Sequence, residues 1–188
     1  SFENVFLVPM PKDTIDVTLD LRNNRREIMT SLTHQVAPSD ILIHHKGEKP
    51  TPYETLQQAA YTTRCIHIAY VAEGYTEEEM PIFLQDAKEE NEAMWNQEPV
   101  KSTKDRFKVL AVKSASLESG TSEPGKDIWK KTALSSHFDT FYSERYLTTL
   151  HLKDLHNWLA GTPYEHIIVL VNSTRYGGGG ILNSYNLT

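Results

Sequence analysis

The sequence has almost no cysteine and no long apolar run. Cys65 is the one cysteine among 188 residues, which excludes an internal disulfide and a four-cysteine zinc site. No apolar stretch approaches the roughly 20 residues that span a bilayer, and the first residues lack the pattern of a signal peptide. Because Cys65 stands at the start of an apolar run, we expect it to be a small buried side chain.

An excess of positive charge is also missing. The 19 Lys and Arg residues stand against 25 Asp and Glu residues, which gives a formal net charge of -6. Nucleic-acid-binding domains usually carry a clear basic stripe, and none is visible here, so we expect no nucleic-acid partner. The 39% hydrophobic and 23% charged residues are typical of a globular protein with one domain, or one domain and a smaller appendage.

The signatures of nucleotide binding and of nucleophilic catalysis are absent. The four consecutive glycines Gly177 to Gly180 do not extend to G-x-G-x-x-G, because Leu182 and Asn183 occupy the places of the third glycine. Residues 116–121 lack the G-x-S-x-G turn that exposes a serine nucleophile. Cys65 lies in a run that we expect to be buried, away from a helix N-terminus that would activate its thiol.

A zinc-binding motif is absent as well. The sequence has eight histidines but no H-E-x-x-H. His151 and His156 are five residues apart, about 140° around a helix at roughly 100° per residue, so they cannot bind one ion from a shared face. We expect His151 to join the apolar side of its helix and His156 to face solvent. The acidic residues between 77 and 92 are interpreted as a solvated helix face.

Residues 1–55 are predicted to be a β-rich N-terminal segment that ends in a linker. Residues 5–8, 15–21 and 41–43 carry the apolar or alternating pattern of strands. Charge, glycine and proline gather at residues 46–52, which is typical of a linker.

Residues 56–188 are predicted to alternate strand and helix. Three runs, at 66–72, 107–112 and 167–171, are predicted to be strands, and the continuous apolar run 66–72 is typical of a strand buried on both faces. This order favours an α/β fold with a mainly parallel sheet and right-handed crossovers. The polar stretch 114–131 is long for a loop, which favours a functional role.

Two helices are expected between these strands. Thr76 and Glu79 form the capping-box pattern of a first helix, which should end before Pro99. The second helix should end near Gly161, and its inward side is marked by Leu147, Leu150, Leu155 and Trp158. The later glycines mark a bulge or a place where another backbone comes close, such as a peptide added to a sheet edge. A flexible hairpin without a ligand is the alternative.

Three stretches together resemble the zinc metallopeptidases named for immunoglobulin-A peptidase. They are AEGYTEEEM at 72–80, residues 116–124 with the core ESGT at 118–121, and VNSTRYGGGGI at 171–181. The resemblance covers about residues 60–188, and the earlier segment is similar to the tail of the family's N-terminal β domain. It implies a zincin-like N-terminal subdomain for residues 56–188, with backing helices and a glycine-rich edge strand.

The resemblance also implies an activity, a cofactor and a location. The family hydrolyses peptide bonds with zinc-activated water, and its H-E-x-x-H helix follows the glycine strand. We therefore expect a bacterial secreted, periplasmic or cell-surface endopeptidase acting on secreted or host proteins. This chain would contribute no zinc ligand or catalytic residue and would be inactive alone. The expected substrate-binding residues are Tyr176, Gly177, Gly178, Gly179, Gly180 and Ile181. A non-catalytic secreted polypeptide- or glycan-binding module is the alternative function.

Overall fold

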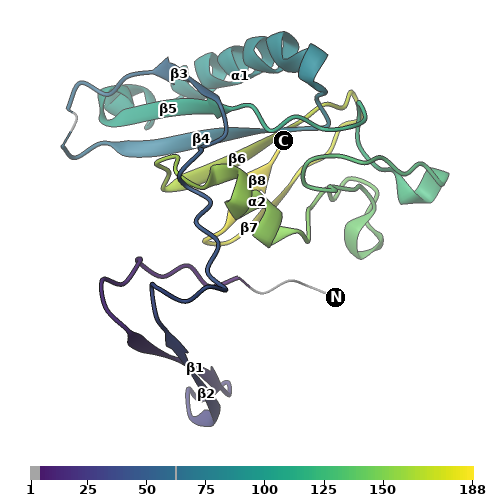
Figure 1. The fold of residues 1–188 in the computed structure, drawn as a ribbon. Helices are drawn as coiled ribbons and strands as arrows, with labels where there is room; N and C mark the ends of the chain where they lie inside the picture. Colours follow the sequence, from purple (N-terminus) through teal and green to yellow (C-terminus); the bar gives the residue numbers. More distant parts are fainter. Residues whose placement is uncertain (1–4, 62) are drawn as a thin grey trace. The chain divides into compact units, whose positions relative to one another are not determined.

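The chain forms two compact units, Phe6–His45 and one that contains Lys46–Thr188. The computed structural model describes residues 5–61 and 63–188 (Figure 1). The predicted strands at 5–8 and 41–43 are wrong, because these residues join no ladder. Short apolar runs form strands only where a partner strand completes their main-chain hydrogen bonds, and these two runs have none among the described residues.

The smaller unit is a hairpin of β1 (Ile15–Arg22) and β2 (Ile28–Val36). The sequence reading missed β2. The turn between the strands is held by Asn23, whose Oδ1 accepts hydrogen bonds from the backbone N–H groups of Arg25 and Glu27. Thr18 and Thr33 hydroxyls meet at 2.9 Å across the polar side of the hairpin.

The larger unit is built on one six-stranded sheet with the order β3-β5-β4-β6-β8-β7. Its strands are β3 (Tyr53–Gln57), β4 (Ile66–Glu73), β5 (Phe107–Val112), β6 (His166–Val171), β7 (Gly179–Ile181) and β8 (Tyr185–Leu187). The inner pairs β5–β4, β4–β6 and β6–β8 are parallel, whereas β3 and β7 are antiparallel edges. The α/β class is confirmed, and the sheet is mixed.

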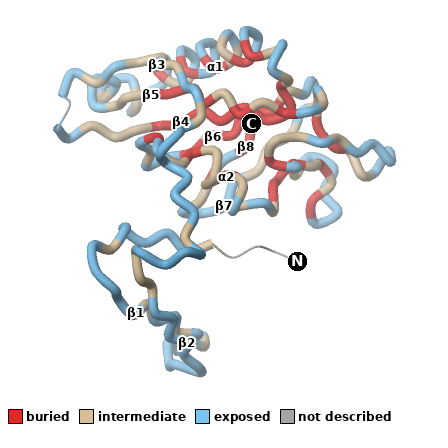
Figure 2. The backbone as a smooth tube through the Cα atoms, in the orientation of Figure 1, coloured by how far each residue is buried: buried red, intermediate tan, exposed pale blue. Residues whose placement is uncertain are grey.

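Helices and an ordered loop cover the two faces of this sheet. Helix α1 (Met80–Trp95) packs Phe83 and Trp95 against one face, together with Tyr70 of β4. The other face carries α2 (Leu152–Leu159) and the buried loop side chains Leu134, Phe138 and Leu147. Buried residues therefore concentrate on the central strands (Figure 2). The described part of this unit also has four short 3₁₀ helices: Glu77–Glu79, Lys101–Arg106, Pro124–Lys126 and Thr140–Tyr142.

The first helix begins as its capping pattern predicts, and the second begins later than expected. The Thr76 N–H donates to Glu79 Oε2 at 2.9 Å, and α1 ends at Trp95, before Pro99. Leu147 is not helical, because its N–H donates to Gly178 O at 3.1 Å. That tertiary hydrogen bond holds the segment before α2 in a loop.

The expected burial of three side chains, His151, His156 and Cys65, is wrong. His151 is exposed at the start of α2, whereas His156 is half-buried and bonds Tyr164 Oη at 2.8 Å. Cys65 is half-buried because it precedes β4 and lies outside the ladder.

Within the described part of the chain, no helix has the length and apolar character needed to cross a membrane.

Candidate functional site

Three stretches that are far apart in the sequence meet where β4 and β6 end. Gly74, directly after β4, donates its N–H to Ser116 Oγ at 3.0 Å and accepts at its carbonyl from the Gly120 N–H at 2.9 Å. Asn172, directly after β6, donates its side-chain amide to the same Gly74 carbonyl at 3.1 Å. Ser119 Oγ adds a hydrogen bond to Glu79 Oε1 at 2.7 Å. The motifs therefore form one connected polar structure at the carboxyl ends of the central strands.

Glycine at position 74 is required by this meeting point. Its φ is +76°, and a Cβ there would lie 2.3 Å from the Gly120 carbonyl oxygen. Gly120 itself has a φ of +91°. L-residues with a side chain rarely adopt such angles, so the two turns depend on glycine.

Glu73 joins the same structure from the end of β4. Its side chain is fully buried and accepts three hydrogen bonds, from Thr132 Oγ1 at 2.5 Å and from the N–H groups of Leu134 and Ser136 at 2.8 Å each. Three donors compensate the loss of water around the carboxyl group. Glu73 therefore fixes the middle of the polar loop on the sheet.

The glycine segment, defined as residues 176–181, contains β7, which is the edge strand of the sheet. Strand β7 pairs with β8 alone among the described strands, with Gly179 opposite Leu187 and Ile181 opposite Tyr185. On its other side, Gly178 donates its N–H to Arg145 O at 3.0 Å and accepts from Leu147 N at 3.1 Å. The chain's own loop therefore pairs with the first part of this edge.

The glycines accommodate that loop. A Cβ on Gly179 would lie 2.1 Å from Leu147 O, and one on Gly177 would lie 2.4 Å from Cε1 of Phe138. The sequence indicates a close backbone approach, and the backbone that approaches Gly177 and Gly179 belongs to the same chain. The glycines alone do not show whether a substrate or an internal loop approaches them, because either backbone needs a position without a side chain.

The part of the edge that stays open begins at Gly180. Main-chain groups alternate in direction along a strand, so those of Gly180 point away from β8, as those of Gly178 do. On this side the described contact is a long hydrogen bond, 3.4 Å, from Tyr146 Oη to the Gly180 carbonyl. Gly180 is exposed, and 41% of Ile181 is exposed.

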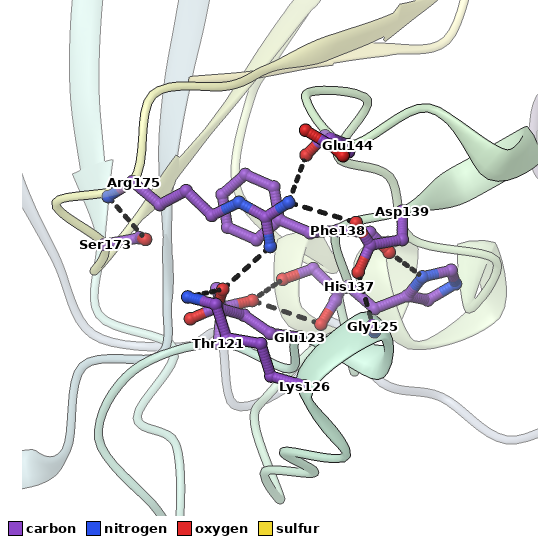
Figure 3. Close-up of polar contacts among 11 residues, drawn as sticks. Thr121, Glu123, Gly125, Lys126, His137, Phe138, Asp139, Glu144, Ser173 and Arg175 are labelled. Atoms are coloured by element: carbon purple, nitrogen blue, oxygen red, sulfur yellow. Dashed lines mark hydrogen bonds and ion pairs between the residues drawn. The ribbon is translucent and has the colours of Figure 1, made fainter.

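Arg175 holds the loop beside the glycine segment (Figure 3). Its guanidinium donates to Glu123 Oε2 at 2.7 Å, to Asp139 Oδ1 at 3.0 Å and to the Glu144 carbonyl at 2.5 Å. It also lies over the Phe138 ring, with Cζ 4.3 Å from the centroid. We call Arg175, Glu123 and Asp139 the arginine cluster.

The carboxyl groups of the arginine cluster have lowered pKa values. The Lys126 ammonium and then Arg175 lower the pKa of Glu123, while the Gly125 N–H and then Arg175 lower that of Asp139. Both groups are thus held ionised, and the guanidinium of Arg175 has a raised pKa through the same carboxylates, which outweigh its burial.

A comparison with known protein families identifies the family of this chain. The model of the family described as IgA peptidase M64 matches residues 55–188, which is most of the chain. The chain belongs to the IgA peptidase M64 family. The predicted family is thereby confirmed, and the protein is a peptidase by its membership. No curated protein matches the chain.

The described residues of this M64 peptidase do not form a metal site. Among residues 5–61 and 63–188, no three His, Cys, Asp or Glu side chains lie where they could hold one ion. His67 bonds Glu165 Oε2 through Nδ1 at 3.0 Å, and His137 Nδ1 lies 2.7 Å from the Phe138 carbonyl. These histidines therefore have structural partners, and the donor set does not fit zinc.

The glycine segment of the M64 chain could be predicted from the sequence, but the loop that covers part of it could not. Arg175 stands in the motif that carries the resemblance, but its partners lie 52 and 36 residues earlier. Their only local signal is polar sequence in a long loop. The covering residues 145–147 were expected to lie in or beside a helix, so their role had no detectable pattern.

Proposed function

We propose that this M64 peptidase is a zinc-dependent endopeptidase with a zincin-like catalytic domain. In it, the larger unit supplies the sheet, the backing helix α1 and the substrate edge, while the zinc ligands come from residues outside those described. The observation that carries the proposal is an antiparallel edge strand, β7, whose outward main chain is open from Gly180 onward.

The open edge suits an extended peptide. A peptide laid along β7 would exchange main-chain hydrogen bonds with the outward N–H and C=O of Gly180, which is the usual mode of strand addition. The connected structure around Glu73 and Gly74, together with the arginine cluster, fixes the loop on one side of this position. A rigid edge strand reduces the conformational entropy lost when the peptide binds, and it would align one peptide bond for attack.

Zinc dependence is tested by metal analysis with a protease assay. In the enzyme that includes its zinc-binding segment, we expect about one zinc per chain. A chelator should abolish cleavage of an unfolded protein substrate, and added zinc should restore it. The 188-residue chain alone should retain no zinc after gel filtration and should cleave nothing. Zinc-free enzyme with full activity would contradict the zinc assignment.

The edge itself is tested by removing the outward N–H of Gly180. Gly180→Pro is made in an Asn186→Ala background, because a Cβ at 180 would lie 2.6 Å from Asn186 Oδ1. Compared with Asn186→Ala alone, we expect kcat/KM to fall about 3- to 10-fold, since one main-chain hydrogen bond contributes about 1 kcal/mol. Zinc content and thermal unfolding should not change. Equal kcat/KM in the two variants would remove the substrate from this edge.

The other predicted edge residues give poorer tests. The Gly178 N–H already donates to Arg145 O, and Gly179 lies opposite Leu187 in the ladder to β8. Proline at either position would break an internal hydrogen bond, so a loss of activity would not identify a substrate contact. Tyr176 and Ile181 remain proposed contacts through their exposed side chains.

The same proposal includes a location at the bacterial surface, in the periplasm or in the medium. It is supported by the family resemblance, and the single cysteine is compatible with either the cytosol or a secreted protein. Cell fractionation with an antibody to the chain tests it, and a purely cytosolic signal would overturn it.

A further inference from the structure

Residues 139–147 form a loop that displays a cation and several aromatic rings beside the glycine segment. Ser143, Arg145 and Tyr146 of this loop line a shallow hollow together with Tyr176, Gly177 and Gly178. The hollow adjoins the open edge, because Tyr146 Oη reaches the Gly180 carbonyl. A side chain of a peptide on that edge would therefore have this hollow within reach.

Arg145 gives the hollow its charge. Its guanidinium lies 5.7 Å from the centroid of the Tyr176 ring, and the residue is exposed. It makes no ion pair with any residue of the described chain, whereas Arg175 in the same region binds two carboxylates. A guanidinium over an aromatic face keeps its N–H edges available for an anion.

The backbone of the loop is held in an unusual conformation. Asp139, Phe141 and Tyr142 have φ values of 62°, 53° and 61°, although none is glycine. Each such residue costs on the order of 1 kcal/mol or more and persists only where the surroundings fix it. Here the Asp139 carboxylate binds Gly125 N and Arg175 at one end, and Leu147 N binds Gly178 O at the other.

This strained loop leaves large rings in solvent. Phe141 is 64% exposed and Tyr142 is fully exposed, and beside the loop Tyr176 of the glycine segment is 79% exposed. The Phe141 and Tyr146 rings stack with centroids 5.8 Å apart, and Tyr146 lines the hollow together with Arg145. A surface that keeps both backbone strain and exposed aromatic rings is typical of a binding site.

We propose that this hollow is a substrate subsite that selects an acidic side chain. The inference rests on the proposed function, because it needs a peptide on the β7 edge. A Glu or Asp carboxylate of that peptide would pair with the Arg145 guanidinium, and Ser143 and Tyr176, which line the same hollow, each carry a hydroxyl donor. A basic side chain would meet an unpaired cation and would be rejected. A neutral side chain would gain only the contact with the rings.

The test uses the zinc-loaded enzyme and a positional peptide library. At each position around the cleaved bond, peptides carry Glu, Gln or Lys and are otherwise identical. We expect one position at which Glu raises kcat/KM about 3- to 10-fold over Gln, the range of a partly exposed charged pair, and at which Lys lowers it. Arg145→Gln should remove the difference in kcat/KM between the Glu and Gln peptides at that position.

The matched control is Arg64→Gln, which removes an exposed arginine at the opposite end of β4 and should keep the Glu preference. Equal cleavage of Glu and Gln peptides at every position, or a Glu preference that persists in Arg145→Gln, would overturn the subsite and leave the peptidase proposal intact. If no peptide or unfolded protein is cleaved by the zinc-loaded enzyme, the proposed function fails, and the subsite fails with it.

Discussion

The Glu73 side chain anchors the polar loop to the end of strand β4. Two of its three hydrogen bonds are to backbone N–H groups of the loop, at Leu134 and Ser136, and the third is to the Thr132 hydroxyl. The two carboxyl oxygens of Glu73 accept from three donors that point inward. The neighbouring Gly74 lets the chain turn directly after it, with a φ of +76°. Together they convert the end of a buried strand into an anchor for the loop.

Exchange of Glu73 for Gln should be strongly destabilising. The amide NH₂ would face at least one of the backbone donors, and leaving a buried donor without an acceptor costs about 1–3 kcal/mol. Urea unfolding followed by near-UV circular dichroism should show the lowered midpoint. The exposed Glu92→Gln is the control and should change stability by less than about 0.5 kcal/mol. A Glu73→Gln midpoint equal to that of the control would contradict the anchoring role.

The loop and strand β7 work as one element. Gly178 pairs with Arg145 and Leu147, and Arg175 ties the same loop to Glu123 and Asp139. The β7 edge is therefore shaped by residues that come 30 or more positions earlier in the chain. Its geometry depends on charge as well as on hydrogen bonds.

This element should loosen in acid. The pKa values of Glu123 and Asp139 are lowered in the folded chain, so their stabilising effect is complete above their unfolded pKa values, about 4. It is lost as the pH falls through the lowered folded values. Hydrogen exchange, corrected for intrinsic rates, should show constant protection of residues 138–147 from pH 7 to about pH 5 and loss of protection below about pH 4.

Arg175→Gln provides the comparison for the acid effect. In this variant the loop should already be less protected at pH 7, and most of the pH dependence should be gone. The buried strand β4 should stay protected in both proteins over the same range. A pH profile of the loop that is the same with and without Arg175 would show that the arginine cluster does not hold it.

At the scale of the whole chain, the larger unit has a parallel centre with antiparallel edges. The strands β4, β5 and β6 could be predicted because each is a continuous apolar run, and a strand buried on both faces needs such a run. Strands β2 and β3 could not. Their sequences, IMTSLTHQV and YETLQ, are largely polar, and neither strand has a fully buried residue, so pairing with a neighbour defines them.

The candidate site divides in the same way. The sequence by itself determined the family, the buried central strands, the first helix and the position of the glycine segment, since each depends on local composition or on residue order. Only the tertiary structure decided that Arg145 and Leu147 cover Gly178 and that the open edge begins at Gly180. The physical reason is that an absent side chain leaves room for any backbone, and which backbone fills that room depends on contacts between distant parts of the chain.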